Sequence, residues 1–234
     1  MAALIYEITW IRPLSLVFGA TIYAVSTIVA SFILGLALGS WFAGRYSDRM
    51  KNPLAWFSYL QIGIGLYGMF LLPIFGLLPG TYFEIYQLTY PNQYFFMFIQ
   101  VVLSMAIISV PATMMGTTLP IMIRVYSSGF STIGKDVGKL DASNSVGAVI
   151  GTLVAGFFMI PILGIQNTII LTALINIGLG LSIITLKRYW TVKKLTGIAI
   201  LAIIFVLLVP SYDVQTLNLG IYAHNNLEFQ EWLH

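Results

Sequence analysis

Glu7 and Arg12 are the residues of this sequence most suited to chemistry inside an apolar environment, because both interrupt one apolar run. An acid or base within a membrane helix costs about 2.5 to 3.5 kcal/mol on insertion scales. Glu7 would bind a cation or a proton, and Arg12 an anion or another helix. Their spacing places them roughly 140° apart on a helix, so they do not face each other. The alternative is that polar groups of neighbouring helices neutralise both, or that Glu7 lies near the membrane interface.

A second polar segment, residues 44–51, carries Gly44, then Asp48 and Arg49, then the base Lys51. This spacing resembles the loop between the second and third helices of major facilitator transporters. The resemblance implies a charge clasp, formed by Gly44, Asp48 and Arg49, that biases a bundle between inward-facing and outward-facing states. The alternative is a basic anchor with one compensating acid.

Asn144 is a third candidate, at the start of a later apolar span. With Asp141 and Ser143 it forms either a polar site inside the membrane or an N-terminal helix cap. Residues 129–136 nearly spell a phosphate-binding loop, but Asp136 stands where a Ser or Thr would hold magnesium, and no strand precedes it. We therefore expect no nucleotide there.

Other site chemistries are excluded by composition. The sequence has no cysteine, and its two histidines both lie in the C-terminal tail. A disulfide framework, a thiol nucleophile and a zinc–thiolate site are thus excluded, and we expect no metal, cofactor or catalytic residue. Ser, His and acid residues form no recognisable hydrolase triad.

The elements that position these residues are apolar helices. Of the 234 residues 59% are apolar and 8% are charged, whereas a soluble domain carries about a quarter charged residues. At about 20 residues per span, the sequence predicts an all-α polytopic membrane bundle of about seven helices. The predicted spans are residues 2–19, 22–44, 54–78, 93–126, 144–163, 168–186 and 195–209.

The connections are also predicted. Residues 79–92 read as an interfacial aromatic loop, Pro111 and Pro120 kink or break the fourth span, and residues 127–144 form a hydrophilic connector. Residues 164–167 form a tight turn. The first span begins at Met1 with no flanking loop, so we expect a shortened helix. Glycines four residues apart, Gly35 with Gly39 and Gly147 with Gly151, predict close helix packing.

The bases predict orientation. Ten of the eleven follow the second, fourth and sixth spans: Arg45, Arg49, Lys51, Arg124, Lys135, Lys139, Lys187, Arg188, Lys193 and Lys194. The positive-inside rule then places the N-terminus in the cytoplasm and the tail after residue 210 outside. If the short run 195–209 does not cross, the tail stays inside. The net charge of +3 comes from these loops, so we expect no nucleic-acid partner.

Several blocks together resemble the membrane region of fused proteins in which a major-facilitator-like bundle precedes a spermidine synthase-like domain. They are residues 2–10, 14–19, 23–27, 35–40, 115–120 and 144–164, and residues 212–224 resemble the start of the synthase-like part. The resemblance implies a transmembrane domain at 1–210, six helices of which form half of a major facilitator fold. It also implies a polar tail at 211–234 that leads into a domain absent from this sequence.

Three functions follow from these observations. The first is the membrane domain of a polyamine aminopropyltransferase-like protein, which anchors it or passes a polyamine, with Glu7 as cation contact. The second is a half-size transporter of small solutes that acts as a homodimer, and the third is a structural subunit of a membrane assembly. By resemblance the parent protein transfers aminopropyl groups, but this chain alone would not. The expected partners are the lipid bilayer and a synthase-like domain or subunit.

Overall fold

The computed structural model describes residues 1–18, 22–89, 92–127, 133–187 and 197. All secondary structure in this part of the chain is helical, which confirms the all-α prediction. The elements are α1 (Ala2–Phe18), α2 (Ile22–Tyr46), a 3₁₀ turn η1 (Ser47–Arg49), α3 (Pro53–Thr89), α4 (Gln93–Tyr126), α5 (Ile133–Val154), a π-helical turn η2 (Ala155–Met159) and α6 (Ile160–Leu186).

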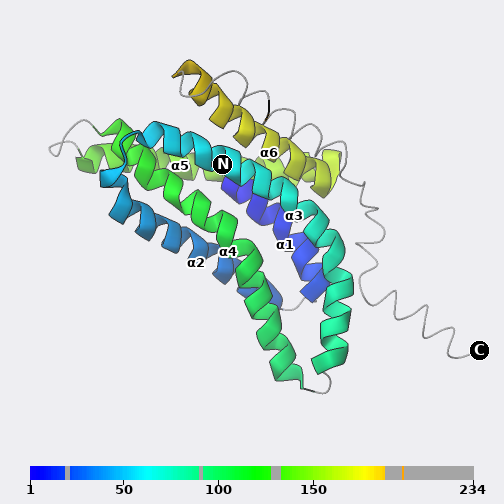
Figure 1. Ribbon diagram of the computed structural model, residues 1–234. Helices are drawn as coiled ribbons and strands as arrows, with labels where there is room; N and C mark the ends of the chain where they lie inside the picture. The colour runs from blue at the N-terminus through cyan, green and yellow to red at the C-terminus, as the bar shows by residue number, and fades with distance from the viewer. Residues whose placement is uncertain (19–21, 90–91, 128–132, 188–196, 198–234) are drawn as a thin grey trace, which may run out of the picture.

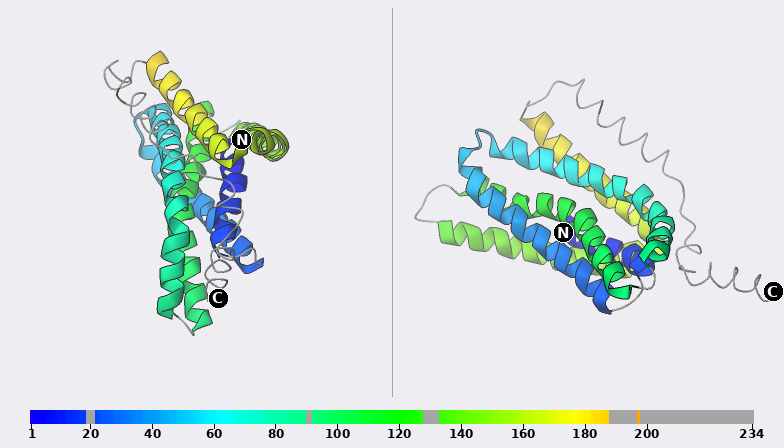
Figure 2. Two further views of the ribbon diagram at one scale, coloured as in Figure 1. Left: turned by 90° about the vertical axis from the view of Figure 1, so that its right-hand side faces the viewer. Right: turned by 60° about the horizontal axis from the view of Figure 1, so that its bottom comes forward.

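The helices form two long pairs around α1. Helix α2 packs along α4, and α3 packs along α6 and also touches α4. Helix α1 runs between them and contacts α2, α3, α5 and α6, as the different views show (Figure 1, Figure 2). The largest fully buried side chains, Trp10 and Tyr6, come from α1, and the core around them takes residues from α2, α3, α4 and α6.

The α2–α4 pair depends on small residues. A Cβ added at Gly35 would lie 2.5 Å from the Ala112 Cβ, and one at Gly39 would overlap the backbone of Thr113. On α4, a Cβ at Gly116 would overlap the backbone of Leu36. The two backbones are so close that the Ser40 hydroxyl donates to the Gly116 carbonyl across the pair, at 3.1 Å. The predicted packing stripe of Gly35 and Gly39 is confirmed.

A second glycine seam joins α3 to α6, and the sequence analysis missed it. A Cβ at Gly65 would lie 2.7 Å from the Ala173 carbonyl oxygen, and one at Gly180 would lie 2.7 Å from the Ser58 carbonyl oxygen. The other predicted stripe meets the start of the chain, since a Cβ at Gly151 would lie 2.8 Å from the Met1 Cγ. Because lipid offers no hydrophobic drive between helices, such seams supply the packing that holds a bundle together.

Helices α3 and α4 both continue through residues where the sequence predicts a loop or a break. Residues 79–89 are the last turns of α3, which has 37 residues, and are not a loop. Helix α4 stays unbroken through Pro111 and Pro120 over 34 residues, so the predicted break is wrong. Both helices bend along their length, and their joined ends project past α1 (Figure 1). Interior prolines are the common cause of such bends, and α3 contains Pro73 and Pro79.

The fifth helix begins earlier than predicted. Helix α5 starts at Ile133, so most of the predicted hydrophilic connector is helical, and Asn144 lies inside the helix and does not cap it. The predicted turn at residues 164–167 coincides with Gly164, whose φ of 78° and ψ of 170° interrupt α6. Only glycine adopts such angles without strain.

Four stretches of the described residues are long and apolar enough to cross a membrane: Val25–Arg49, Pro53–Leu77, Tyr94–Tyr126 and Ile133–Leu186. The last holds 54 residues and includes the turn at Gly164. The predicted number of seven is not confirmed. Helix α1, with 17 residues, is not among the four stretches, and the predicted fifth and sixth spans fall in one of them. The seventh run, 195–209, lies outside the described residues apart from residue 197. The predicted tail domain, 211–234, also lies outside them.

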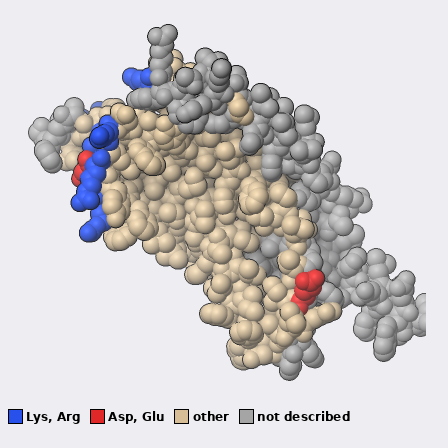
Figure 3. Space-filling view, in the orientation of Figure 1, with Lys and Arg blue, Asp and Glu red and all other residues tan. Residues whose placement is uncertain are grey.

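Basic side chains gather at one end of the bundle, where α2 ends and α3 begins (Figure 3). Helix α4 ends and α5 begins at this same end (Figure 1). At the opposite end α3 leads into α4, and no base occurs between Lys51 and Arg124 in the sequence. The bases that follow the second and fourth predicted spans therefore lie together at one end of the folded bundle.

We expect Gly39→Ala to disrupt the α2–α4 pair, because its methyl group has no room beside Thr113 and overpacking costs about 1 to 3 kcal/mol. Thermal unfolding of the purified protein in detergent measures the loss. The matched control is Gly44→Ala, five residues along α2, where nothing lies within 4 Å of an added Cβ. Equal melting temperatures for the two variants would contradict the close approach.

Candidate functional site

Glu7 and Arg12 both lie on α1. The Glu7 side chain is only partly buried, whereas its neighbour Tyr6 is fully buried. No ion pair links Glu7 to a base whose side chain the structure describes. The side chain of Arg12 lies outside the described part, so its predicted role as a contact for an anion or another helix stays a prediction. Glu7 nevertheless follows Tyr6 directly in sequence, at the edge of the buried face of α1.

That face carries a polar cluster that the sequence analysis missed. Tyr6 and Trp10 stack with ring centroids 4.9 Å apart at 27°. The Asn176 side chain, from α6, neighbours the Tyr6 hydroxyl without the geometry of a hydrogen bond. The Tyr6 hydroxyl, Trp10 Nε1 and Asn176 Nδ2 are all buried, and none has a hydrogen-bond partner. Helix α3 closes the cluster with Gly68, where a Cβ would lie 2.8 Å from the Tyr6 hydroxyl.

These unpaired atoms stand out because nearby polar groups are paired. The Thr9 hydroxyl donates to the Ile5 carbonyl at 2.9 Å, and Thr172, one turn before Asn176, donates to the Thr168 carbonyl at 2.8 Å. Tyr67 on α3 donates to the Ile107 carbonyl on α4 at 3.0 Å. A buried polar group without a partner costs about 1 to 3 kcal/mol. Three such atoms around one aromatic pair mark the cluster as a candidate site.

The second feature is a clasp at the basic end of the bundle. Arg124, in the last turn of α4, donates through Nη1 to the Ser47 carbonyl and through Nη2 to the Met50 carbonyl, the latter at 3.3 Å. Its Nη1 also lies 3.5 Å from Asp48 Oδ1. One guanidinium therefore ties the η1 turn between α2 and α3 to the end of α4.

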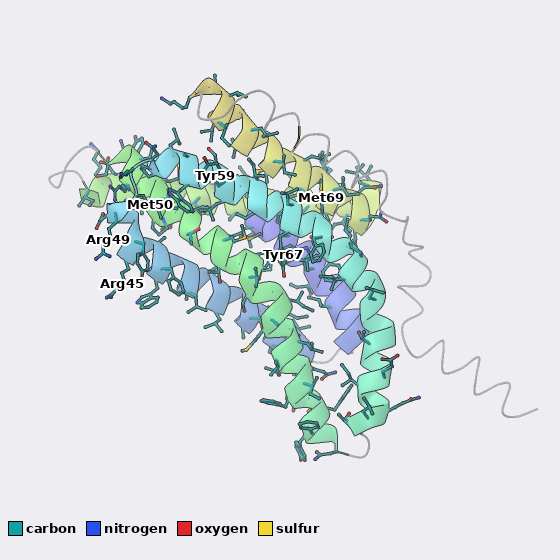
Figure 4. The ribbon with its side chains drawn as sticks, in the orientation of Figure 1. Arg45, Arg49, Met50, Tyr59, Tyr67 and Met69 are labelled. Carbon is teal, nitrogen blue, oxygen red and sulfur yellow. The ribbon has the colours of Figure 1, made fainter. Side chains whose placement is uncertain are left out.

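The predicted clasp residues do not all take part. Asp48 does, but its ion-pair partner is Arg124, which the sequence analysis counted only as a topological base. Arg45 and Arg49 are exposed and point away from the bundle (Figure 4). Gly44 has open space around it, so no close approach requires a glycine there. A state-dependent role for Gly44, Asp48 and Arg49 stays a prediction.

Asn144 is exposed on α5, in a run of exposed residues from Asp141 to Val146. It is far in sequence from the cluster on α1, and the structure gives it no described contact with Glu7. Its assignment to an intramembrane polar site stays a prediction. Among the described residues no group of three or more His, Cys, Asp or Glu could hold a metal ion.

We expect Arg124→Gln to destabilise the end of α4 by about 2 kcal/mol, because hydrogen bonds from a charged donor are worth about 1.5 to 3 kcal/mol. Cleavage by trypsin after Arg49 or Lys51 should become faster, since the turn is released. Asp48→Asn is the control, because the Asp48 side chain is 90% exposed and an exposed ion pair contributes less than about 1 kcal/mol. If Asp48→Asn accelerated cleavage as much, the carboxylate and not the carbonyl contacts would hold the turn.

Comparison with known proteins gives one similarity. A polyamine aminopropyltransferase from Leptospira interrogans (serogroup Icterohaemorrhagiae, serovar copenhageni, strain Fiocruz L1-130) is 23% identical to this chain over 178 residues. The similar region is 76% of this chain but 32% of that protein, so the chain spans about a third of its relative. No family model matches the chain. No solved structure matches it either.

Proposed function

We propose that this chain is the cell-membrane domain of a polyamine aminopropyltransferase-like protein. One observation carries the proposal: the similarity to an aminopropyltransferase extends over 178 residues of a chain that the structure shows to be a bundle of long apolar helices. A soluble transferase domain has no use for such helices. The chain then either anchors the transferase part or passes a polyamine through the bilayer.

Glu7 is the residue proposed to contact the polyamine. A protonated amine in a low-dielectric site requires a carboxylate, and such residues in membrane helices face the bundle interior. Glu7 lies on α1, which contacts α2, α3, α5 and α6, and its side chain is partly buried. Glu84, an acid near the end of the long apolar helix α3, is by contrast exposed.

A half-size transporter of the major facilitator type, acting as a dimer, is the second candidate. The observation that favours it is the contact of Asp48 with Arg124, since it joins the loop of the transporter-like motif to a neighbouring helix. A clasp of this kind would have to open and close during transport. A structural subunit would need neither this contact nor the Glu7 site.

We expect the chain in lipid nanodiscs to bind radiolabelled putrescine or spermidine, and Glu7→Gln to lower the affinity at least about tenfold, the equivalent of roughly 1.4 kcal/mol. Glu84→Gln is the matched control and should bind as the unchanged chain does. Equal binding by the chain and both variants would remove Glu7 from the site. No binding at all would leave anchoring as the role, and uptake into proteoliposomes separates passage from binding.

The orientation can be tested with single cysteines, because the chain has none of its own. Lys51→Cys lies at the basic end and Gln87→Cys near the opposite end of α3. In intact cells we expect a membrane-impermeant maleimide to label Gln87→Cys, and to label Lys51→Cys only after the cells are opened. The reverse pattern would invert the proposed topology.

A further inference from the structure

We propose that Tyr6, Trp10 and Asn176 form an internal binding site for a neutral, hydrogen-bond-accepting oxygen, that of a water molecule or of a small hydroxylated solute. The site lies between α1 and α6, with α3 closing it at Gly68. It is distinct from the proposed polyamine contact at Glu7 and does not depend on it.

The chemistry of the unpaired atoms selects the ligand. Trp10 Nε1 and Asn176 Nδ2 are donors only, and the Tyr6 hydroxyl both donates and accepts. All three atoms can donate a hydrogen bond and none of them has an acceptor in the protein, so the missing partner is an acceptor. An ammonium group has only donors, so it would leave both nitrogens unpaired. An anion would lie close to Glu7 on the same helix, which disfavours it.

Because the three polar atoms are buried, only a bound oxygen can supply the hydrogen bond that each of them lacks. Tyr6 is 0% exposed, Trp10 1% and Asn176 4%, so bulk water does not pair these atoms. Internal waters occur where about two to four otherwise unpaired polar groups meet, and they make about three hydrogen bonds each. The three unpaired atoms come from two helices in contact, and their number equals the hydrogen bonds that one internal water makes. The adjacent hydroxyls of Thr9 and Thr172 are already paired with backbone carbonyls, so they do not compete for it.

The site also explains why Gly68 faces Tyr6. A Cβ at this position would lie 2.7 Å from Tyr6 Cε1 and 2.8 Å from its hydroxyl oxygen. A larger residue would push the ring and move the hydroxyl relative to Asn176. The glycine therefore fixes the position of one of the three groups that hold the oxygen.

X-ray radiolysis footprinting of the full chain in lipid nanodiscs tests the proposal, because radicals formed from a bound water oxidise the side chains next to it. We expect Tyr6 and Trp10 to be oxidised although both are buried. Phe32, 2% exposed on α2 in the same core, should stay unmodified. Absence of oxidation at both Tyr6 and Trp10 would overturn the proposal without any variant.

Two double variants show whether the polar atoms hold the oxygen. In Tyr6→Phe with Asn176→Leu, oxidation of Trp10 should fall several-fold. In the matched pair Tyr67→Phe with Thr172→Val, which removes hydroxyls that already have partners, it should not change. If Trp10 oxidation persisted in the first pair, water would reach it by opening of the bundle, and the site would be rejected.

Glycerol as the probe distinguishes the two sources of the oxygen. Tyr94, 84% exposed, reports how much glycerol scavenges radicals in bulk solution. A larger fall at Tyr6 than at Tyr94 supports a site that accepts a solute hydroxyl, and a smaller fall supports a site that holds its own water. An equal fall would mean that radicals from bulk solution reach Tyr6, and it would count against the site.

Discussion

The bundle depends on how closely its helix backbones approach one another. Between apolar helices in lipid, burial of apolar surface gives no net gain, so contact distance decides which helices associate. The α2–α4 and α3–α6 pairs both meet this requirement with glycines facing backbone atoms. Helix α1 lies between these two pairs. The positions of the polar side chains on α1 therefore depend on the α2–α4 and α3–α6 glycine seams, neither of which contains a residue of α1.

The polar features occupy two separate regions of this frame. At the basic end, Arg124 closes the turn between α2 and α3 with backbone carbonyls and Asp48. In the interior, Tyr6, Trp10 and Asn176 bring together hydrogen-bonding groups that lack protein partners. The first region ties helices together at a surface, and the second leaves hydrogen-bonding capacity within the core.

Much of the frame could be predicted from the sequence, and its failures have physical causes. Hydropathy located α2, α4 and the turn at Gly164, because long apolar runs and glycine leave clear signals. It missed the first turns of α5, since Lys135, Asp136 and Asn144 are polar although they are helical. It also ended α3 early, because residues 79–92 have the composition of an interfacial aromatic loop, whereas the helix continues to Thr89. The site was harder: Asn176 meets Tyr6 only through the packing of α6 on α1, and no spacing in the sequence encodes that contact. Arg124 was missed for the same reason, since its partners come from a turn more than 70 residues away in the sequence.

The projecting ends of α3 and α4 bear on the membrane itself. At about 1.5 Å per residue, helices of 37 and 34 residues measure roughly 55 and 50 Å, against about 30 Å for the hydrocarbon layer. Such lengths are accommodated by tilt, by bending or by local thickening of the bilayer, each at a modest energetic cost per ångström of mismatch. The shorter α1, with 17 residues, has no comparable excess. In a bilayer, a change of thickness would therefore act more on α3 and α4 than on α1, so the lipid composition would change the strain inside this bundle.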